Sequence, residues 1–184
     1  MTGSWETERL LLRDLGPESA AAVRDYGLRT RDFHAPWDPI RAADYWELPI
    51  VAERLRAQQE DSRAGRALCL CVSHRDDPER IIGVANLRNI IRGALLSAHL
   101  GYGLAPDATG RGYMTEAVKE AVRIAFFDLG LHRVEINIMP RNVRSLAVAE
   151  RAGFVREGFS PRYLRINGAW EDHVRLARVN EAMV

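Results

Sequence analysis

The stretch LAPDATGRGYMTEAVKEAVRIAF, residues 104–126, joins the end of a predicted strand to a long predicted helix through a glycine-rich turn. The strand ends at Pro106, and the turn runs from Thr109 to Thr115. A turn of this kind leaves several backbone N–H groups unpaired at a helix N-terminus, and such groups suit a phosphate or pyrophosphate. Because glycine serves any tight turn, an ordinary strand-to-helix connection is the alternative interpretation.

Two nucleotide-binding motifs can be tested against this turn, and neither fits. Thr115 stands where the dinucleotide fingerprint that begins at Gly110 requires glycine or alanine. A phosphate loop of the NTPase type requires Gly-Lys-Ser/Thr, which the sequence lacks. The turn therefore predicts a site for a pyrophosphate that another molecule carries, such as coenzyme A.

The turn resembles the acyl-CoA loop of the GNAT acetyltransferases, which has the pattern Gln/Arg-x-x-Gly-x-Gly/Ala. Gly112 stands at the required glycine, whereas Thr109 and Met114 replace the Gln/Arg and the final Gly/Ala. Because main-chain N–H groups do most of the binding in such a loop, these departures change the motif more than the chemistry. The loop residues that the resemblance assigns to acetyl-CoA are Thr109, Gly110, Arg111, Gly112, Tyr113, Met114 and Thr115.

The resemblance covers nearly the whole chain and is specific to the RimJ/RimL branch of that superfamily. The blocks that carry it are Glu6 to Arg13, Ala35 to Pro39, Ile81 to Asn86, Arg92-Gly93, Leu100 to Tyr102 and Tyr163 to His173. The RimJ type acetylates the N-terminal alanine of a small-subunit ribosomal protein. The resemblance thus implies that the acetyl group of acetyl-CoA moves by direct attack, in a ternary complex, to the α-amine of a ribosomal protein.

Other acceptors and another class of function stay open. This scaffold serves many acceptors, so a small amine, an antibiotic or a lysine is the alternative within the enzyme class. Outside that class, the alternative is a CoA-binding or ribosome-associated module without useful turnover, which the atypical Thr109 and Met114 favour. The sequence leaves the acyl-chain preference and the oligomeric state undetermined.

Composition agrees with one enzyme domain over residues 1–184. Hydrophobic residues make up 47% of the chain, enough for one sizeable core. With 26 Lys+Arg against 25 Asp+Glu, the net charge of +1 predicts no general attraction to nucleic acid or membrane. The N-terminal Met1 to Trp5 has no basic region, and no apolar run approaches about 18 residues, so we expect a cytoplasmic protein.

The two cysteines do not indicate a metal site or a disulfide. Cys69 and Cys71 stand two apart in the apolar run from Ala67 to Val72, so on a strand they share a face. Neighbours of this kind cannot easily bridge each other, and only His74 lies near them. We expect an ordinary strand here and assign no metal.

Periodicity and turn residues predict a chain of mixed α and β structure. We expect strands at 8–14, 66–74, 80–91, 95–104, 133–138, 154–166 and 169–179, and helices at 17–26, 42–62, 112–129 and from Asn142 to Gly153. Turns near residues 75–78 and 91–93 predict consecutive antiparallel pairing of the strands between 66 and 104. Gly130 suits a helix C-cap, and Asn167-Gly168 suits the turn of a closing hairpin.

The family resemblance implies the GNAT fold, a mostly antiparallel sheet with helices on both faces, in which two neighbouring strands separate and admit acyl-CoA. Those strands would be the one ending at Leu104 and the one running from Arg133 to Ile138. Tyr102, Gly103 and Leu104 would offer main-chain hydrogen bonds to the pantetheine and thioester, as an added strand would. Asn142 would hydrogen-bond the pantetheine and also cap the helix that follows it.

Acetyl transfer requires a neutral amine, a stabilised oxyanion and a thiolate that departs. A free thiol has a pKa of about 8.5, so a weak acid suffices to protonate the departing sulfur. By resemblance, Ser145 in Pro140-x-Asn142-x-x-Ser145 is this catalytic acid. Its alternative role is that of a polar residue in the first turn of the helix.

The acceptor site and the general base are less closely defined. The resemblance gives the acceptor site Trp37, Asp38 and His99, although Trp37 could equally be a buried anchor of its loop. The base stays open among Asp38, His99, Glu135 and Asp172, each of which is otherwise a surface charge or an interstrand partner.

A glutamate serves in the hairpin of the RimL branch, but Leu164 stands at that position here, so the assignment does not transfer. The acceptor's own pKa decides how strong a base is needed. An N-terminal amine costs roughly 1 kcal/mol to be neutral at pH 7, and a lysine costs about 5 kcal/mol. A weak or water-mediated base therefore suffices for an α-amine.

Overall fold

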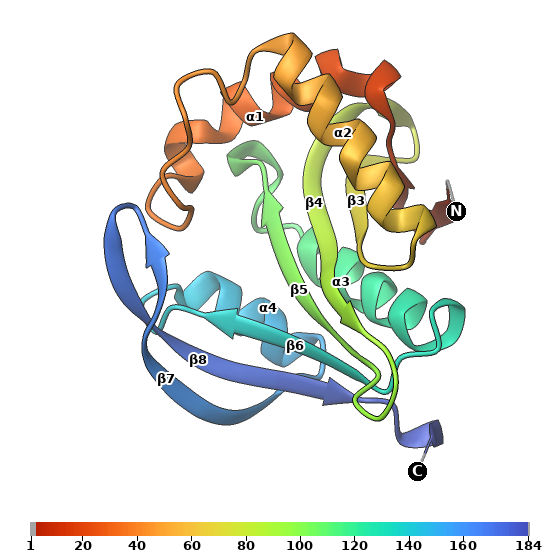
Figure 1. The fold of residues 1–184 in the computed structure, drawn as a ribbon, viewed down its shortest axis with the longest axis vertical. Helices are drawn as coiled ribbons and strands as arrows, with labels where there is room; N and C mark the ends of the chain where they lie inside the picture. The colour runs from red at the N-terminus through yellow and green to blue at the C-terminus, as the bar shows by residue number, and fades with distance from the viewer. Residues whose placement is uncertain (1–2, 184) are drawn as a thin grey trace.

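The computed structural model describes residues 3–183 and is built around one eight-stranded sheet of order β1-β2-β3-β4-β5-β6-β8-β7 (Figure 1). The strands are β1 (Ser4–Glu6), β2 (Leu10–Asp14), β3 (Leu68–His74), β4 (Asp77–Ile91), β5 (Ser97–Leu104), β6 (Arg133–Ile138), β7 (Val155–Ile166) and β8 (Ala169–Val179). Neighbouring strands are antiparallel except β5 and β6, which are parallel. The predicted mostly antiparallel sheet, including the consecutive pairing of β3, β4 and β5, is confirmed.

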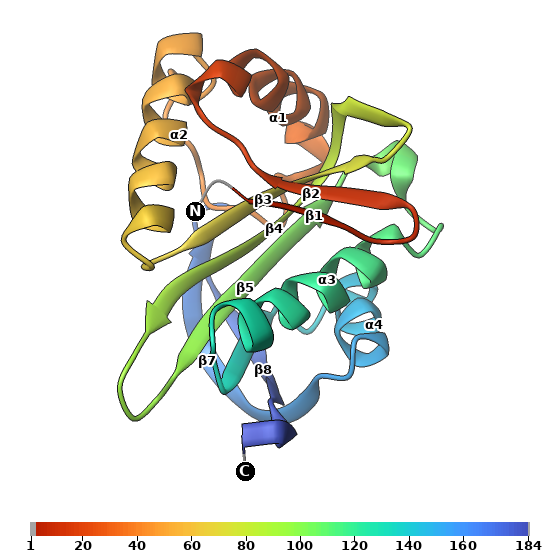
Figure 2. The same cartoon turned by 90° about the vertical axis from the view of Figure 1, so that its right-hand side faces the viewer.

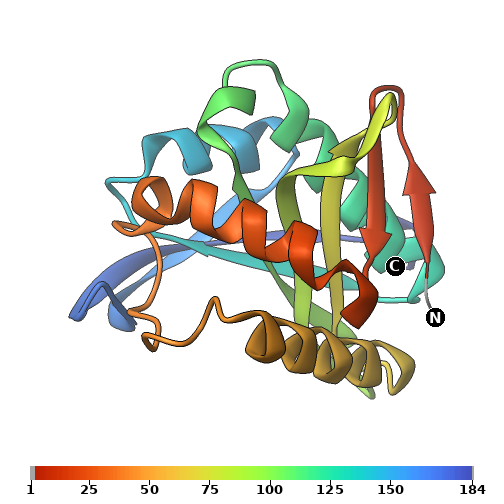
Figure 3. The ribbon, with the colours of Figure 1, turned by 90° about the horizontal axis from the view of Figure 1, so that it is seen from above.

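Helices cover both faces of this sheet, as expected. They are α1 (Ala20–His34), α2 (Leu48–Arg63), α3 (Tyr113–Arg123) and α4 (Val143–Arg151). The helices α1 and α2 lie on one face, and α3 and α4 lie on the other (Figure 2, Figure 3). Within residues 3–183, no helix is both long and apolar enough to cross a membrane.

The main core lies between the sheet and α3. Val118, Ala121 and Val122 on the inner face of α3 are almost completely buried, which the helical spacing of the sequence predicts. They pack in one cluster with residues of several strands, including Leu70 of β3 and Leu87 of β4. Each fully buried valine or leucine contributes about 1.5–3 kcal/mol relative to an exposed one.

The first helix is longer than the sequence predicts. It was expected to end at Tyr26, but after a short 3-10 turn at Pro17–Ser19 it runs from Ala20 to His34. Glycine weakens a helix interior, yet Gly27 is needed here because a Cβ would lie 2.0 Å from ring atoms of Trp46. Tertiary packing against Trp46 therefore overrides the local preference.

The second helix begins later than predicted. Residues 42–47 form turns, in which Ala42 O and Asp44 O accept hydrogen bonds from residues three positions ahead. The helix starts at Leu48 with Pro49 in its first turn, where a missing N–H costs nothing. Pro49 thus marks the start of α2, which helical periodicity alone does not reveal.

Two further boundaries differ from the prediction, and the remaining ones agree within a few residues. The strand expected at 8–14 is β2, and the sequence analysis missed β1, which pairs with it. The helix expected at 112–129 is α3 followed by a π-helical turn at Ile124–Asp128. Gly130 has φ +63° at the end of that turn, in the left-handed conformation predicted for it. Asn167 and Gly168 also have positive φ in the β7–β8 turn.

Cys69 and Cys71 lie on β3 and are both free thiols, as the sequence predicts. Burial raises the pKa of both thiols.

Candidate active site

The glycine-rich turn folds as the sequence predicts. Gly110 and Gly112 have φ values of +79° and +80°, a region that side chains other than glycine rarely adopt. Gly112 caps α3, whose first intrahelical bond runs from Glu116 N to Gly112 O. Among the described residues, the N–H groups of residues 110–115 have no hydrogen-bond partner. The turn therefore presents a group of free donors at the positive end of the α3 dipole.

The turn is held in place from the β1–β2 hairpin. Glu116 Oε1 accepts hydrogen bonds from Thr7 Oγ1 at 2.6 Å and from Arg9 N at 3.0 Å. Its Oε2 accepts from Arg9 Nε at 2.8 Å, and Arg9 Nη1 donates to Arg111 O at 3.1 Å. One carboxylate thus ties the hairpin to the first turn of α3.

We expect Glu116→Gln to lower the free energy of unfolding by about 1.5–3 kcal/mol at pH 7, the range for hydrogen bonds to a charged group. Burial raises the pKa of Glu116, but the hydrogen bonds from Thr7 and Arg9 outweigh it, so the folded-state pKa is lowered. A lowered folded-state pKa stabilises the protein above the unfolded value of about 4.3, and this contribution is lost as the pH falls below it. Urea unfolding at pH 7 and at pH 3 measures both effects.

Glu60→Gln on the exposed face of α2 is the matched control, with an expected change within about 0.5 kcal/mol. Equal stability of the two variants at pH 7, or a loss for Glu116→Gln that is undiminished at pH 3, would contradict the assignment.

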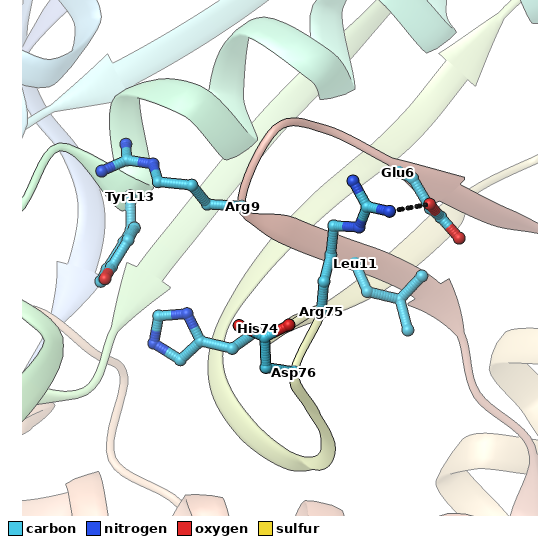
Figure 4. Close-up of a pocket in the computed structure, with 7 residues that line it drawn as sticks. All are labelled: Glu6, Arg9, Leu11, His74, Arg75, Asp76 and Tyr113. Carbon is cyan, nitrogen blue, oxygen red and sulfur yellow. Dashed lines mark ion pairs between the residues drawn. The ribbon is translucent and has the colours of Figure 1, made fainter.

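A cavity of about 490 Å³ lies beside the turn, between the β1–β2 and β3–β4 connections (Figure 4). Its lining residues are Glu6, Arg9, Leu11, His74, Arg75, Asp76 and Tyr113. Arg75 pairs with Glu6 at 3.1 Å, and Arg9 pairs with Glu116 at 2.6 Å while it stacks on the Tyr113 ring. Because both guanidinium groups are already paired, we assign this cavity no ligand.

The strands β5 and β6 separate after a short stretch of pairing, as predicted. They pair only from Ser97 to His99 and from Arg133 to Glu135, and beyond this point they diverge toward α1 and α4 (Figure 1). On the other side of β5, Ala105 N donates to Ile82 O at 2.7 Å. Bonded and non-bonded pairs alternate along an antiparallel ladder. The peptide groups of Tyr102 and Leu104 therefore face the gap, whereas those of Gly103 face β4.

Ser145 lies in the first turn of α4, at the opposite side of the gap. Asn142 caps this helix by accepting a hydrogen bond from Ser145 N at 3.2 Å. Ser145 Oγ donates to the Tyr102 hydroxyl at 2.9 Å, and that hydroxyl donates to Ser145 O at 2.8 Å. Burial raises the pKa of Tyr102 to about 12, so its hydroxyl keeps its proton near neutral pH. The sequence analysis did not foresee this side-chain role for Tyr102.

The predicted acceptor residues Trp37 and Asp38 lie in the loop after α1, next to the tip of the β7–β8 hairpin. Asp38 O accepts a hydrogen bond from Asn167 N at 2.9 Å. Arg141, in the turn between β6 and α4, stacks on Trp37 at 5.4 Å and pairs with Glu171 of β8 at 3.0 Å. Arg141 therefore links the loop to the hairpin, a connection that sequence analysis missed.

His99 lies apart from these residues, at the closed end of the gap. It is in register with Glu135, the last pair before the strands separate, and its Nε2 lies 3.7 Å from Glu135 Oε2. Glu135 also accepts from Arg133 Nε at 2.9 Å and lies 4.0 Å from Arg175. His99 and Glu135 thus belong to a charge network on the sheet.

Free donors on a glycine turn, beside a gap lined by outward-facing peptide groups and by the Tyr102 and Ser145 hydroxyls, are features that a CoA-dependent acyltransferase needs. Comparison with known proteins agrees: the family model of the acetyltransferase (GNAT) domain matches residues 9–155. The chain therefore belongs to the GNAT acetyltransferases. It is an N-acetyltransferase, and acetyl-CoA is its acetyl donor.

Three similar proteins show which members of the family this chain resembles. The chain is 41% identical over 165 residues to the Bacillus subtilis protein named "Probable N-acetyltransferase YjcK", covering 89% of this chain and 91% of that protein. It is 36% identical over 171 residues to the ribosomal protein uS5-alanine N-acetyltransferase of Escherichia coli, covering 93% and 88%. The solved structure of the ribosomal-protein-S5-alanine acetyltransferase from Vibrio fischeri superposes with a TM-score of 0.92 at 32% identity, covering 97% of each chain.

Proposed function

We propose that this enzyme acetylates the N-terminal alanine of a ribosomal protein. The observation that carries the proposal is the similarity, over nine tenths of the chain, to an enzyme named for that acceptor. The near-identical backbone of a second enzyme with the same named acceptor supports it further.

The surface around the acceptor loop also favours a protein acceptor. Large apolar side chains are exposed on the β7–β8 hairpin and the neighbouring loop: Ile40 is 72% exposed, Trp170 62% and Leu164 42%. The Ile40 side chain lies 3.4 Å from the position that a Cβ at Gly168 would take, so the loop contacts the tip of the hairpin. Leu164 pairs with Glu171 and Arg165 with Trp170, so Leu164 and Trp170 lie on opposite faces of the hairpin. Exposed apolar side chains on both faces of the hairpin and on the adjoining loop favour contact with a protein acceptor.

The proposed reaction uses the two walls of the gap for different tasks. The thioester lies along β5, where the peptide groups of Tyr102 and Leu104 hydrogen-bond the pantetheine and the thioester oxygen. The neutral amine attacks the carbonyl carbon, a C–N bond forms, and the C–S bond breaks. Ser145 donates the proton that the sulfur takes as it leaves, and Tyr102 orients the Ser145 hydroxyl.

Three acceptors test the proposed function with purified protein and acetyl-CoA. The first is a peptide with a free N-terminal alanine, the second is the same peptide with a blocked N-terminus and a free lysine, and the third is spermidine. Acetylation of the first alone is the expected result. Acetylation of the blocked peptide or of spermidine, with the first unmodified, would replace this acceptor with a lysine or a small amine.

A further inference from the structure

The last residue of α1 reaches the gap between β5 and β6. His34 Nε2 lies 3.0 Å from Leu104 O, one of the carbonyl groups that face the gap. A Cβ at Gly103 would lie 3.3 Å from His34 Cε1 and 3.5 Å from Nε2. Glycine at position 103 therefore leaves room for the imidazole ring, which lies against β5 on the face that α1 covers.

The contact with Leu104 decides which ring nitrogen carries the proton. A carbonyl oxygen can only accept a hydrogen bond, so Nε2 is the donor. In the neutral ring, Nδ1 then holds a free lone pair, and no described residue donates a hydrogen bond to it. Leu104 O has a second lone pair, so it can hold the imidazole and still accept from a pantetheine amide.

A second polar group is buried at the same place. The Tyr26 hydroxyl lies 3.8 Å from the Cβ position of Gly103, and its residue is only 7% exposed. Thr30 acts on this hydroxyl, but no hydrogen bond of ordinary geometry joins it to a described residue. A buried hydroxyl with so little bonding beside an imidazole favours a polar ligand group at this place, because burial without a good hydrogen bond is costly.

The other candidate bases are already engaged. Asp38 lies 3.7 Å from Arg41, and Asp172 Oδ1 accepts from Arg162 N at 2.8 Å. Glu135 is surrounded by cationic partners, and His99 Nδ1 lies 3.2 Å from Asn89 Nδ2 while its Nε2 faces Glu135. Each of these groups already has a partner, whereas no described residue donates a hydrogen bond to His34 Nδ1.

We propose that His34 is the general base that takes a proton from the acceptor ammonium group. The ammonium transfers one proton to Nδ1, which gives a neutral amine and an imidazolium ion whose Nε2–H still bonds Leu104 O. The amine attacks the thioester, the C–S bond breaks, and the sulfur takes a proton from Ser145. The nitrogen then loses its second proton, which restores the Ser145 hydroxyl. His34 then releases its proton to water. This step applies to any primary amine and does not depend on the alanine acceptor.

The titratable neighbours of this ring come from three elements. Tyr26 on α1 has its ring centroid 6.4 Å from that of His34, and burial raises its pKa, so it stays neutral. Cys71 of β3, Asp38 of the loop and Arg29 of α1 act electrostatically on Tyr26 and so lie in the same region. From β5 the Leu104 carbonyl group contacts the ring.

His34→Gln tests the proposal because the glutamine amide can still donate to Leu104 O but cannot take a proton. The assay uses whichever primary amine the unmodified enzyme acetylates, so failure of the alanine peptide leaves the test intact. We expect kcat at pH 7 to fall about 100-fold, in the range for loss of a general base, with the Kd for CoA within about twofold. His132→Gln, a histidine outside the site, is the control and keeps the kcat of the unmodified enzyme.

The pH profile separates a proton-transfer role from a structural one. In the unmodified enzyme kcat does not follow the titration of the amine, because His34 removes the proton from the bound ammonium group. In His34→Gln kcat rises through the titration of the amine, at about 7.7–8.0 for an N-terminus, because only amine that is already neutral reacts. Added imidazole should restore part of the rate to His34→Ala. An unchanged kcat and pH profile in His34→Gln, or weaker CoA binding with an unchanged profile, would overturn the proposal.

Discussion

Ser145→Ala should lower kcat about 100-fold and leave the Kd for acetyl-CoA nearly unchanged. The hydroxyl donates to Tyr102 at 2.9 Å at one wall of the gap, and the substitution removes the proton that it would give to the sulfur. General acids contribute roughly 10²–10⁴-fold, and we expect the lower end because a thiol with a pKa of about 8.5 is a fair leaving group. Steady-state kinetics and calorimetry with CoA measure the two quantities.

Two controls distinguish proton donation by Ser145 from a role of its side chain in packing. Ser145→Cys keeps a dissociable proton at the same place and should retain a rate within about tenfold of the unmodified enzyme. An acetyl thioester of an acidic aryl thiol needs no proton on its sulfur, so with this donor the Ser145→Ala variant should lose much less activity. Equal losses with both donors, or equal losses in the alanine and cysteine variants, would mean that Ser145 acts through packing alone.

The sequence predicts the parts of the fold that short-range signals determine. Gly130 and the Asn167-Gly168 turn adopt the positive φ values that their residue types favour. The ends of α1 and α2 are different, because they depend on contacts across the chain. The continuation of α1 through Gly27 rests on the Trp46 ring, which no local propensity can indicate.

The candidate site likewise has local features that the sequence predicts and long-range contacts that it does not. The glycine turn and the Asn142 cap are local arrangements, and the structure has both as the sequence predicts. The contacts from Tyr102 to Ser145 and from His34 to Leu104 join residues 43 and 70 positions apart. No signal in a single sequence pairs residues so far apart, so these contacts are visible only once β5, α1 and α4 are placed together.

Gly112→Val should weaken CoA binding about 10- to 100-fold. Gly112 has φ +80°, and a β-branched residue in that conformation carries strain on the order of 1–3 kcal/mol. The chain can relieve the strain only by rotating the peptide groups around position 112, which turns the free N–H groups of the turn away from a bound pyrophosphate. Calorimetric titration with CoA measures the loss, and a thermal melt shows how much of the fold is affected.

Gly130→Val is the matched control because Gly130 has φ +63° and a Cβ there would meet no atom within 4 Å. Both variants carry a similar backbone strain and should lower the Tm by a similar amount, but Gly130 lies at the far end of the helical segment from the turn. Only Gly112→Val should therefore lose CoA affinity. If both variants bind CoA alike, the affinity does not come from the main-chain N–H groups of the turn, and side chains such as Arg111 would have to supply it. Loss of affinity in Gly112→Val alone would also account for the departures of Thr109 and Met114 from the family pattern, because the glycines would then hold the main-chain N–H groups in place whatever the side chains at those two positions.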